Sequence, residues 1–364
     1  MNIKLLGEPE VIMQNPQSKH NYFGWPTAAR LQNGKIAVVA SGYRVRHVCP
    51  FGKTVIAYSD DEGKSYTRPA VVIDTVLDDR DGGILAFGKS GVMVTSFNNT
   101  VAFQRDRADS TAYDLAYLDM VSPDEEARDL GANFVISNDF GVTFGEIHKS
   151  PITSPHGPIE LSDGSILWVG RTFSPDNSHR IGIDRIEAHV VAPDGSMTHI
   201  GTIDNVYDPD LGFVPLSCEP HAVELSDGSI LAHIRVHNKK NQREFLTVYQ
   251  SISRDKGRTW TKPERILDKI GGAPAHLFKH SSGVLISTYG YRYEPFGIKA
   301  MFSYDSGKTW DTDNDIYING ISLDLGYPST VELSDGSLLT VFYACTEKNG
   351  PAVIMQQNWR FENE

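Results

Sequence analysis

Residues 253–260 read Ser-Arg-Asp-Lys-Gly-Arg-Thr-Trp, and their skeleton, S-x-D-x-G-x-x-aromatic, occurs four times in the 364-residue chain. In such a turn the aspartate accepts backbone hydrogen bonds, the glycine takes a positive φ, and the aromatic ring folds back against its own strands. Four copies with one internal spacing indicate that the chain builds one supersecondary unit repeatedly. The other copies are Ser59/Asp61/Gly63/Tyr66, Ser137/Asp139/Gly141/Phe144 and Ser303/Asp305/Gly307/Trp310.

A second repeat, a hairpin signal, alternates with the first. Leu-Ser-Asp-Gly-Ser followed by two aliphatic residues occurs at 161–167, 225–231 and 333–339, and weaker copies lie at 31–36, 89–93 and 281–285. Asn-Gly or Asp-Gly between apolar runs is the strongest short-range hairpin signal. Two hairpins per unit make a four-stranded antiparallel sheet, and six units make an all-β, six-bladed β-propeller. The near absence of helical periodicity excludes an α-solenoid, and a sandwich would not need six equivalent copies.

Residues 1–364 are therefore predicted to form one propeller domain. The last unit ends close to the C-terminus, so the N-terminal strand is predicted to complete the last sheet and fasten the ring. The longest insertion runs from Gln104 to Asp129 and contains a short predicted helix over residues 123–128. Long loops on a rigid scaffold tend to line sites, although a solvated excursion is the alternative.

Composition restricts the function classes. The net charge of −12 argues against a nucleic-acid surface, which normally needs a basic face. Because there is no apolar span of about 18 residues, no membrane segment is expected. The first residues lack the apolar core of a signal peptide, and the three cysteines, Cys49, Cys218 and Cys345, have no metal-binding spacing. We expect a cytoplasmic protein without a metal or cofactor.

The repeats also predict which residues face the axis. Counting nine residues back from each hairpin glycine marks the start of the innermost strands, and counting seven forward marks the return of the second strands. Acid, phenol and arginine side chains occur together at these two sets of positions. They predict a ligand site in a central funnel, although propeller channels are routinely polar. The first set is Trp25, Gly82, Pro155, Glu219, Pro274 and Tyr327, and the second is Ser41, Asn98, Arg171, Arg235, Gly290 and Tyr343.

Two loops with matching sequences add candidate arginines. Gly42-Tyr43-Arg44 and Gly290-Tyr291-Arg292 are each followed by Pro-Phe-Gly and by a strand that leads into an aspartate turn. This paired placement predicts that Arg44 and Arg292 point into one basin and bind an anion, whereas a solvated surface position is the alternative.

The segment that opens the second unit is rich in carboxylates. Asp78, Asp79 and Asp81 surround Arg80, which is electrostatically costly unless some of the acids are paired or serve as proton donors. A calcium site is the structural alternative.

Several histidines lie near the predicted mouth, namely His47, His156, His221, His237 and His276. No H-E-x-x-H or comparable pair exists, so no zinc site is expected. His47 and His156 are retained as candidate site residues.

The four aspartate turns resemble the Asp-box, or BNR, repeats of sialidases and their relatives, which are six-bladed propellers. The resemblance covers nearly the whole chain, but it specifies the scaffold better than the reaction, because binding and lyase propellers share the repeat. Sialidases use a Tyr nucleophile in a G-Y-S-like context, and Gly326-Tyr327-Pro328-Ser329 resembles it. Their activating Glu lies in an N-E-P-like context, which Ser217-Cys218-Glu219-Pro220 resembles. Arg235 matches one arginine of the carboxylate-binding triad in place, and Arg292 is the candidate to stand in for a second.

Two features depart from the sialidase pattern. The first triad arginine precedes an I-P-T-like segment in the family, whereas this chain has Gly24 before Trp25-Pro26-Thr27. The acid/base Asp of the family lies in the loop before the first Asp-box, and residues 47–54 contain none. Asp81, Asp79 and His47 are the candidates to protonate the leaving oxygen.

These features lead to three hypotheses. The first is an exo-acting, sialidase-like glycoside hydrolase for an anionic terminal sugar of an oligosaccharide or glycoside. In it Glu219 activates Tyr327, and arginines bind the carboxylate, with Arg44, Arg80, Arg171, Arg235, Arg292, Trp25 and His156 as candidate substrate contacts. The second is a uronate-directed glycosidase or lyase that uses His47 or His156 with Tyr327. The third is a carbohydrate-binding propeller without catalysis.

Overall fold

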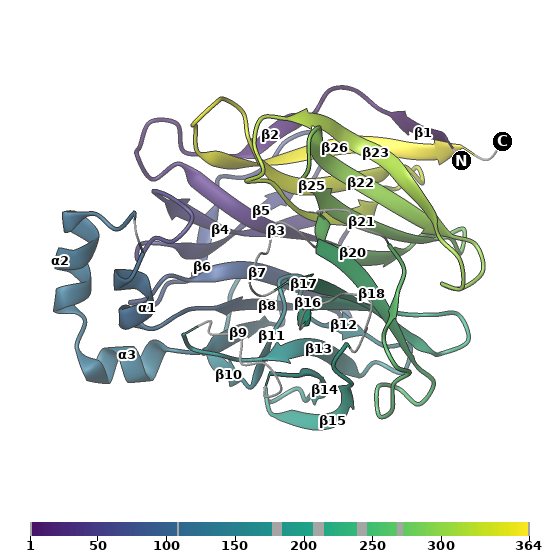
Figure 1. The fold of residues 1–364 in the computed structure, drawn as a ribbon, viewed down its shortest axis with the longest axis horizontal. Helices are drawn as coiled ribbons and strands as arrows, with labels where there is room; N and C mark the ends of the chain where they lie inside the picture. The colour runs from purple at the N-terminus through teal and green to yellow at the C-terminus, as the bar shows by residue number, and fades with distance from the viewer. Residues whose placement is uncertain are drawn as a thin grey trace.

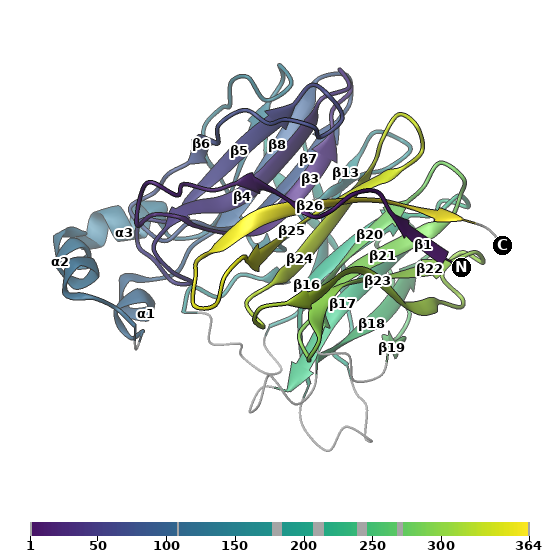
Figure 2. The same cartoon turned by 90° about the horizontal axis from the view of Figure 1, so that it is seen from above.

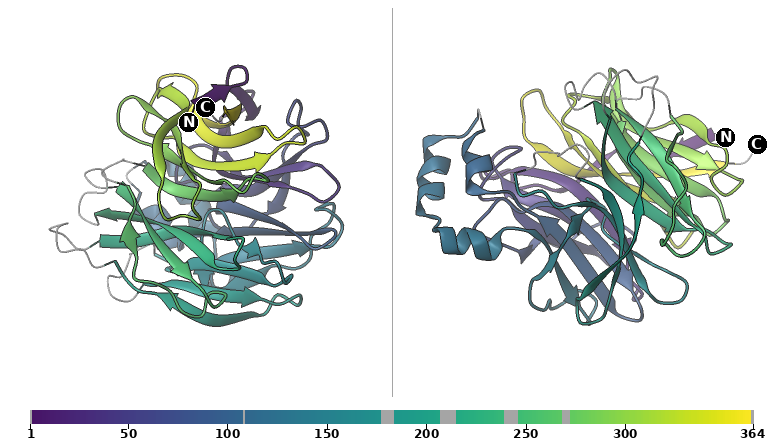
Figure 3. Two further views of the ribbon diagram at one scale, coloured as in Figure 1. Left: turned by 90° about the vertical axis from the view of Figure 1, so that its right-hand side faces the viewer. Right: turned by 60° about the horizontal axis from the view of Figure 1, so that its bottom comes forward.

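A computed structural model describes residues 2–107, 109–176, 184–206, 215–238, 246–267 and 272–362. The chain forms six antiparallel sheets arranged as the blades of a propeller (Figures 1 and 3), which confirms the predicted fold. The innermost strands of neighbouring blades contact one another, and the innermost strand of the last blade contacts that of the first, so the ring is closed.

In the first three blades the strands follow one another from the axis outward, as the repeated hairpins predict. Blade 3 differs because two short strands, β11 and β12, together take the innermost position beside β13. The strands are β3 (Tyr22–Arg30), β4 (Ile36–Arg44), β5 (Lys53–Ser59) and β6 (Ala70–Ile73) in blade 1; β7 (Arg80–Phe87), β8 (Gly91–Phe97), β9 (Ala132–Ser137) and β10 (His148–Ser150) in blade 2; and β11 (Ile152–Thr153), β12 (Ile159–Glu160), β13 (Ile166–Thr172), β14 (Ile186–Val191) and β15 (Met197–Ile203) in blade 3.

Blades 4 and 5 repeat the same order, and blade 6 contains both ends of the chain. The strands are β16 (Pro215–Glu224), β17 (Ile230–Asn238), β18 (Leu246–Ser253) and β19 (Glu264–Arg265) in blade 4; β20 (Gly272–Lys279), β21 (Leu285–Tyr291), β22 (Phe296–Ser303) and β23 (Asp311–Gly320) in blade 5; and β24 (Gly326–Glu332), β25 (Leu338–Cys345), β26 (Ala352–Glu362), β1 (Asn2–Leu5) and β2 (Glu10–Met13) in blade 6.

The N-terminal strands fasten the ring, as predicted. Both β1 and β2 pair with the last strand β26, and Asn2 lies opposite Glu362 in the register. Figure 2 shows β1 beside the end of β26, so the two termini of the chain are neighbours. The blade that carries Tyr327 is therefore built from both ends of the sequence.

The hydrophobic core is a ring of clusters between adjacent blades. One cluster joins blade 1 to blade 6, for example through Val38 and Val341, and another joins blade 3 to blade 4 through Val169 and Ala232. Side chains on the faces of these sheets are buried against the next sheet, as expected when every blade is covered on both faces.

The aspartate turns have one hydrogen-bond pattern in all four copies. In the turn at residues 253–260, Ser253 Oγ donates to Asp255 Oδ1 at 2.8 Å and accepts from Gly257 N at 2.8 Å, while Thr259 N donates to Asp255 Oδ1 at 2.8 Å. The predicted packing of the aromatic ring is only partly correct, because Trp310 Nε1 donates to Gln250 Oε1 of the preceding blade at 2.9 Å. The turns therefore help to hold neighbouring blades together.

The long insertion in blade 2 folds into three helices beside the propeller (Figure 1): α1 (Val101–Arg105), α2 (Ala112–Met120) and α3 (Pro123–Asp129). The predicted helix is confirmed as α3, which begins with a capping box between Ser122 and Glu125. The other two helices were not predicted. Phe51 packs against Tyr117 of α2, with ring centroids 4.8 Å apart, and so joins the insertion to blade 1. No helix of the described residues has the length and apolar character to cross a membrane.

Candidate active site

A bulge in the innermost strands positions the central side chains. In blades 1, 2, 4 and 6 the register to the second strand shifts near the axis, and the first residue of the shift is Trp25, Asp81, Glu219 or Tyr327. These four residues all have positive φ values, of 54°, 48°, 46° and 50° respectively. A positive φ is uncommon for residues other than glycine, and bulges often re-aim side chains at functional sites.

The counting rule is wrong by one residue in two blades. In blades 2 and 5 the bulge begins ten residues before the hairpin glycine instead of nine, so Asp81 takes the position predicted for Gly82 and residue 273 takes that of Pro274. The second strands shift likewise, and Phe97 and Tyr291 replace the predicted Asn98 and Gly290. The causes differ: in blade 2 the hairpin turns at residues 88–90, so the counted Gly91 already pairs with Phe87, whereas in blade 5 each strand has one extra residue between the bulge and the turn.

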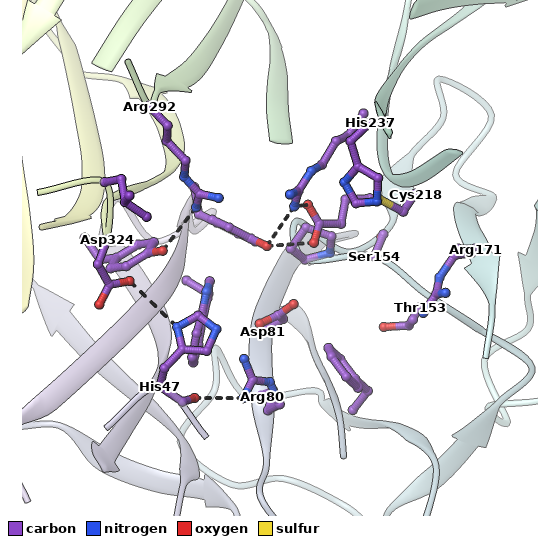
Figure 4. A pocket seen from close by; sticks show the side chains of 18 residues that line it. His47, Arg80, Asp81, Thr153, Ser154, Arg171, Cys218, His237, Arg292 and Asp324 are labelled. Atoms are coloured by element: carbon purple, nitrogen blue, oxygen red, sulfur yellow. Dashed lines mark hydrogen bonds and ion pairs between the residues drawn. The ribbon is translucent and has the colours of Figure 1, made fainter. Parts of the chain in front are cut away.

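The bulges open into a cavity of about 470 Å³. Figure 4 shows Asp81 in the middle of it, with His47 and Asp324 on one side and Arg171 and Thr153 on the other. The cavity is lined by Trp25, His47, Arg80, Asp81, Phe97, Thr153, Ser154, Pro155, Arg171, Cys218, Glu219, Arg235, His237, Arg292, Leu323, Asp324, Tyr327 and Tyr343.

A phenol, a carboxylate and a guanidinium form a chain of contacts in the cavity. Tyr327 Oη donates to Glu219 Oε1 at 2.6 Å, and Arg235 Nη1 donates to Glu219 Oε2 at 2.5 Å. Burial alone would raise the pKa of Glu219, but the charge of Arg235 and the bond from Tyr327 outweigh burial and lower it. Burial and the charge of Glu219 raise the pKa of Tyr327 well above its ordinary value. The phenol is therefore neutral, beside an ionised base that can take its proton.

Asp81 differs from Glu219, because the pKa of its carboxyl group is raised and not lowered. It is 7% exposed, and its Oδ1 is buried without a hydrogen-bond partner. Burial raises the pKa of Asp81 to about 7, with the charge of Glu219 acting in the same direction and that of Arg80 against it. Glu219 and Asp81 thus form a pair of one ionised and one protonated carboxyl group at slightly acid pH, which is how enzymes divide acid and base roles.

Arg44 does not reach the cavity, in contrast to its prediction as a substrate contact. It is fully buried, and Nη1 lies 2.5 Å from Asp78 Oδ1 while Nη2 donates to the carbonyl of His47 at 2.7 Å. Arg80 does line the cavity, but it also donates to Asp78, at 3.2 Å, and its guanidinium lies 4.4 Å from the centre of the Trp25 ring. Asp78 therefore holds the guanidinium groups of Arg44 and Arg80 beside the Trp25 ring.

Asp79, the third acid of this segment, lies outside the cavity. It accepts hydrogen bonds from the backbone amide of Thr75 at 2.7 Å and from its hydroxyl at 2.9 Å. Burial raises the pKa of Asp79 to about 7. Its contacts fit a role in holding the loop and not in proton transfer to a ligand.

The remaining cavity arginines differ in their partners. Arg171 Nη1 lies 3.5 Å from Asp184 Oδ2, so it is held by a carboxylate. Arg292 instead donates from Nε to the carbonyl of Leu325 at 2.9 Å and from Nη2 to Tyr343 Oη at 3.1 Å. Within the described part of the chain, Arg292 is the cavity arginine without a carboxylate partner.

His47 lies at the edge of the cavity with two partners that the sequence did not suggest. Tyr22 Oη donates to Asp324 Oδ2 at 3.0 Å and lies 3.3 Å from His47 Nδ1. Because Tyr22 has a single proton, which Asp324 accepts, Nδ1 of His47 carries the hydrogen and Nε2 is an acceptor. Desolvation lowers the pKa of His47, with Asp324 opposing, so the ring is neutral near pH 7.

His156 lies outside the cavity, contrary to the prediction that it contacts substrate there. With His221 and His276 it lines a second cavity of about 480 Å³ on the axis, and all three side chains are buried. The backbone amide of Leu277 donates to His221 Nδ1 at 3.0 Å, so Nε2 of that ring carries the hydrogen and lacks the lone pair that a metal needs. Among the described residues, no group of three or more His, Cys, Asp or Glu side chains could hold a metal ion.

Two side chains of the site were not predicted from the sequence. They are Asp324 and Tyr22, which contact each other across blades 1 and 6. Asp324 lies three residues before Tyr327, and an acid beside the Gly-Tyr motif was a signal that could have been used. Tyr22 gave no signal, because its contact depends on how the start of β3 packs against the loop before β24.

Comparisons with known proteins agree with the fold. A family model described as BNR repeat-like domain matches residues 53–341. No curated protein sequence matches the chain. A protein of unknown function from Dyadobacter fermentans is similar in structure, with 19% identity, a TM-score of 0.74, and coverage of 99% of this chain and 100% of that one. NanB sialidase from Streptococcus pneumoniae matches at 14% identity with a TM-score of 0.66, over 97% of this chain and 70% of that one.

A sialidase from Trypanosoma rangeli matches at 14% identity with a TM-score of 0.60, over 99% of this chain and 58% of that one. At these identities the likeness to solved structures shows the fold, whereas the family model covers most of the sequence. The chain belongs to the BNR repeat-like domain family, and its fold is that of a six-bladed propeller.

Proposed function

We propose that this protein is an exo-acting glycoside hydrolase that removes an anionic terminal sugar, with Tyr327 as nucleophile and Glu219 as its base. One observation carries the proposal: a buried phenol donates at 2.6 Å to a carboxylate that is itself held by Arg235 at 2.5 Å. A phenol is a weak nucleophile at its ordinary pKa and needs an adjacent base, which this contact supplies.

The first step replaces the leaving group by the enzyme. Tyr327 Oη bonds to the anomeric carbon and passes its proton to Glu219, while the bond from that carbon to the leaving oxygen breaks. Asp81 supplies a proton to the leaving oxygen, because it is buried, lines the same cavity and has a pKa of about 7.

The second step restores the enzyme. A water molecule gives a proton to the Asp81 carboxylate and attacks the anomeric carbon, and the phenolate leaves and recovers its proton from Glu219. A neutral tyrosine also avoids the repulsion that a carboxylate nucleophile would exert on an anionic sugar.

Selection of an anionic sugar rests on the arginines. Arg292 lines the cavity and is bonded only to a carbonyl and a phenol among the described residues, so a substrate carboxylate can become its ionic partner. Arg235 lies 3.5 Å from Tyr327 Oη and can contact the same carboxylate. Arginine binds carboxylates through two parallel hydrogen bonds, which favours a carboxylated sugar over a neutral one.

The test is a hydrolysis screen of aryl glycosides, including those of sialic acid and uronic acids, on wild type and Tyr327→Phe. Release from an anionic glycoside that the substitution abolishes would support the proposal. Turnover that persists in Tyr327→Phe would refute the role of the phenol. An absorbance rise from an unsaturated uronate would point to a lyase, and binding without turnover of every glycoside would point to a carbohydrate-binding protein.

A further inference from the structure

The second cavity, of about 480 Å³, lies at the other end of the innermost strands, and the proposed reaction does not use it. In β24, for example, Tyr327 near the start of the strand lines the candidate active site, whereas Thr330 and Glu332 toward its end line the second cavity. The innermost strands of all six blades contribute side chains to this cavity. It therefore lies on the propeller axis, opposite the candidate active site, and is called the rear cavity below.

Two histidines of the rear cavity hold neighbouring blades together, each through one ring nitrogen. His221 Nδ1 accepts from the backbone amide of Leu277 in the next blade at 3.0 Å. His276 Nδ1 accepts in the same way from the backbone amide of Thr330, at 3.3 Å. In blade 6 the hydroxyl of Ser329 makes the comparable contact, because it accepts from a backbone amide of blade 1 at 3.1 Å. A serine is thus sufficient for this contact, so the contact does not explain why two positions carry an imidazole with a second nitrogen.

The second nitrogens present two hydrogen-bond donors to the rear cavity. Burial lowers the pKa of His221 to about 3 and the pKa values of His156 and His276 well below the ordinary value, so all three rings are neutral. A neutral ring whose Nδ1 accepts a hydrogen bond carries its hydrogen on Nε2. Both His221 and His276 line the cavity, and within the described residues neither Nε2 has a hydrogen-bond partner. These two rings are stacked, with centroids 4.5 Å apart and planes at 14°, so both donors belong to one part of the wall.

A third histidine adds an acceptor to the same wall. The hydroxyl of Thr27 donates to the carbonyl of Pro155 at 3.0 Å, so it accepts from His156 Nδ1, which lies 3.3 Å away. Nε2 of His156 therefore has a lone pair, and among the described residues this buried atom has no hydrogen-bond partner. The ring of His156 lies 5.1 Å from that of His276 and 5.5 Å from that of His221, measured between centroids. An unpaired buried acceptor costs free energy, which a donor group of a ligand in the cavity would recover.

The charges around the rear cavity disfavour an anion. Three glutamates line it, and each accepts a backbone amide of a neighbouring hairpin at 2.6 to 2.9 Å: Glu160, Glu224 and Glu332. Of the two cationic side chains in the described lining, Arg30 is paired with Glu62 at 2.6 Å, which leaves Lys279 against three carboxylates. An anionic ligand would therefore be repelled, and a cationic group has no lone pair for the imidazole donors.

The remainder of the lining is apolar and leaves room for the body of a small molecule. It consists mainly of aliphatic side chains and Phe278, and several of the aliphatic residues are alanines, among them Ala86. A volume of about 480 Å³ is within the range of small-molecule sites, which are mostly apolar with a few convergent polar groups. The rear cavity has this size and this composition.

We propose that the rear cavity is a second binding site, for an uncharged small molecule with an apolar body and a carboxamide group. The carbonyl oxygen has two lone pairs for the N–H groups of His221 and His276, and the amide N–H donates to His156 Nε2. The apolar body lies against the aliphatic side chains. No residue of the proposed hydrolysis takes part, so the two proposals stand or fall separately.

Benzamide is the probe, because it joins a carboxamide to a compact apolar ring, and benzoate is its anionic counterpart of the same shape. Binding of each is measured by ligand-observed NMR titration, which needs no turnover. The variant is His276→Asn, in which the asparagine oxygen keeps an acceptor for the backbone amide of Thr330 while the Nε2–H donor is lost. The matched control is His233→Asn, because His233 is also buried but contacts Ser287 and Gln250 and does not line the cavity.

We expect His276→Asn to weaken benzamide binding at least about tenfold, the equivalent of about 1.4 kcal/mol, and His233→Asn to change it less than about twofold. Benzoate should bind wild type at least about tenfold more weakly than benzamide. Failure of wild type to bind benzamide, or equal affinity in wild type and His276→Asn, would overturn the proposal. Benzoate that binds as tightly as benzamide would overturn the assignment of an uncharged ligand.

A second variant keeps the test decisive if His276→Asn does not fold, which its melting curve in circular dichroism would reveal. Ala86→Trp places an indole in the rear cavity and leaves all three histidines unchanged, because Ala86 is a half-buried residue of β7 that lines the cavity. Loss of benzamide binding in Ala86→Trp supports the site, whereas unchanged binding would place the probe elsewhere and refute it. Neither result depends on hydrolysis by the candidate active site.

Discussion

Replacement of Asp81 by Asn is expected to stabilise the protein at alkaline pH and to impair catalysis. Burial raises the pKa of this carboxyl group to about 7, against about 3.9 in an unfolded chain, and about three units correspond to roughly 4 kcal/mol. The folded state binds the proton more tightly than the unfolded chain, so loss of that proton destabilises the fold. This cost grows as pH rises from about 4 to about 7 and keeps its full value above that. Asn carries no charge and avoids this cost.

The assay is urea unfolding followed by tryptophan fluorescence at pH 5 and pH 8. At pH 5 the cost to wild type is only about 1.5 kcal/mol, so the stability of Asp81→Asn relative to wild type should increase by about 3 kcal/mol between pH 5 and pH 8. Asp79, whose pKa is also raised to about 7, is present in both proteins and cancels in the comparison. A difference in stability that does not change with pH would refute the assignment of a raised pKa to Asp81.

The same variant separates proton donation from a purely structural role. Loss of a general acid should lower kcat for an oligosaccharide by about 10²- to 10⁴-fold, but should affect a glycosyl fluoride much less, because fluoride leaves without needing a full proton. Wild type should lose activity toward oligosaccharides as pH rises through about 7, where Asp81 ionises. Equal losses on both substrates would contradict the role of Asp81 as acid.

Three further outcomes are expected. Glu219→Gln should lower kcat by about 10²- to 10⁴-fold, because Tyr327 loses its base, and should also reduce stability in urea by about 3–5 kcal/mol, because Arg235 is left as a buried charge without its partner. Arg292→Ala should raise KM for an anionic glycoside by about 10- to 100-fold, while KM for its neutral methyl ester should hardly change; equal effects on both would contradict a carboxylate contact. Hydrogen bonds from Thr259 lower the pKa of Asp255 to about 2, so this aspartate turn contributes stability above about pH 4 that is lost as pH falls to about 2. Asp255→Asn should accordingly have a lower melting temperature than wild type at pH 7 and approach it at pH 2, and a gap that persists at pH 2 would contradict this.

The propeller could be predicted because its signals are local. Each aspartate turn is specified by a serine, an aspartate and a glycine within five residues, as at Ser253, Asp255 and Gly257, and the structure shows these three groups bonded to one another. The aspartate turn occurs four times, so the number of blades follows from the six hairpin signals that alternate with it, without any knowledge of how the blades pack.

The site was predictable only as far as the blades are equivalent. The count from the hairpin glycine leads correctly to Trp25, Glu219 and Tyr327, but it fails at Asp81, because the hairpin of blade 2 turns at residues 88–90 and the counted glycine is already the first residue of β8. A one-residue slip reverses which face a side chain occupies. The burial of Arg44 could not be predicted, because it depends on Asp78, which belongs to the neighbouring blade.

Closure of the ring by the two ends of the chain has a consequence for folding. Asn2 pairs with Glu362, so the contact that completes blade 6 joins residues separated by almost the whole sequence, and such distant contacts form slowly. The other blades consist of strands that are consecutive in the sequence, whereas the blade that carries Tyr327 needs both ends of the chain, and we expect it to be completed last. During refolding, β-sheet signal in circular dichroism should therefore recover before enzymatic activity, and the delay between them would measure the time that the protein needs to join its two ends.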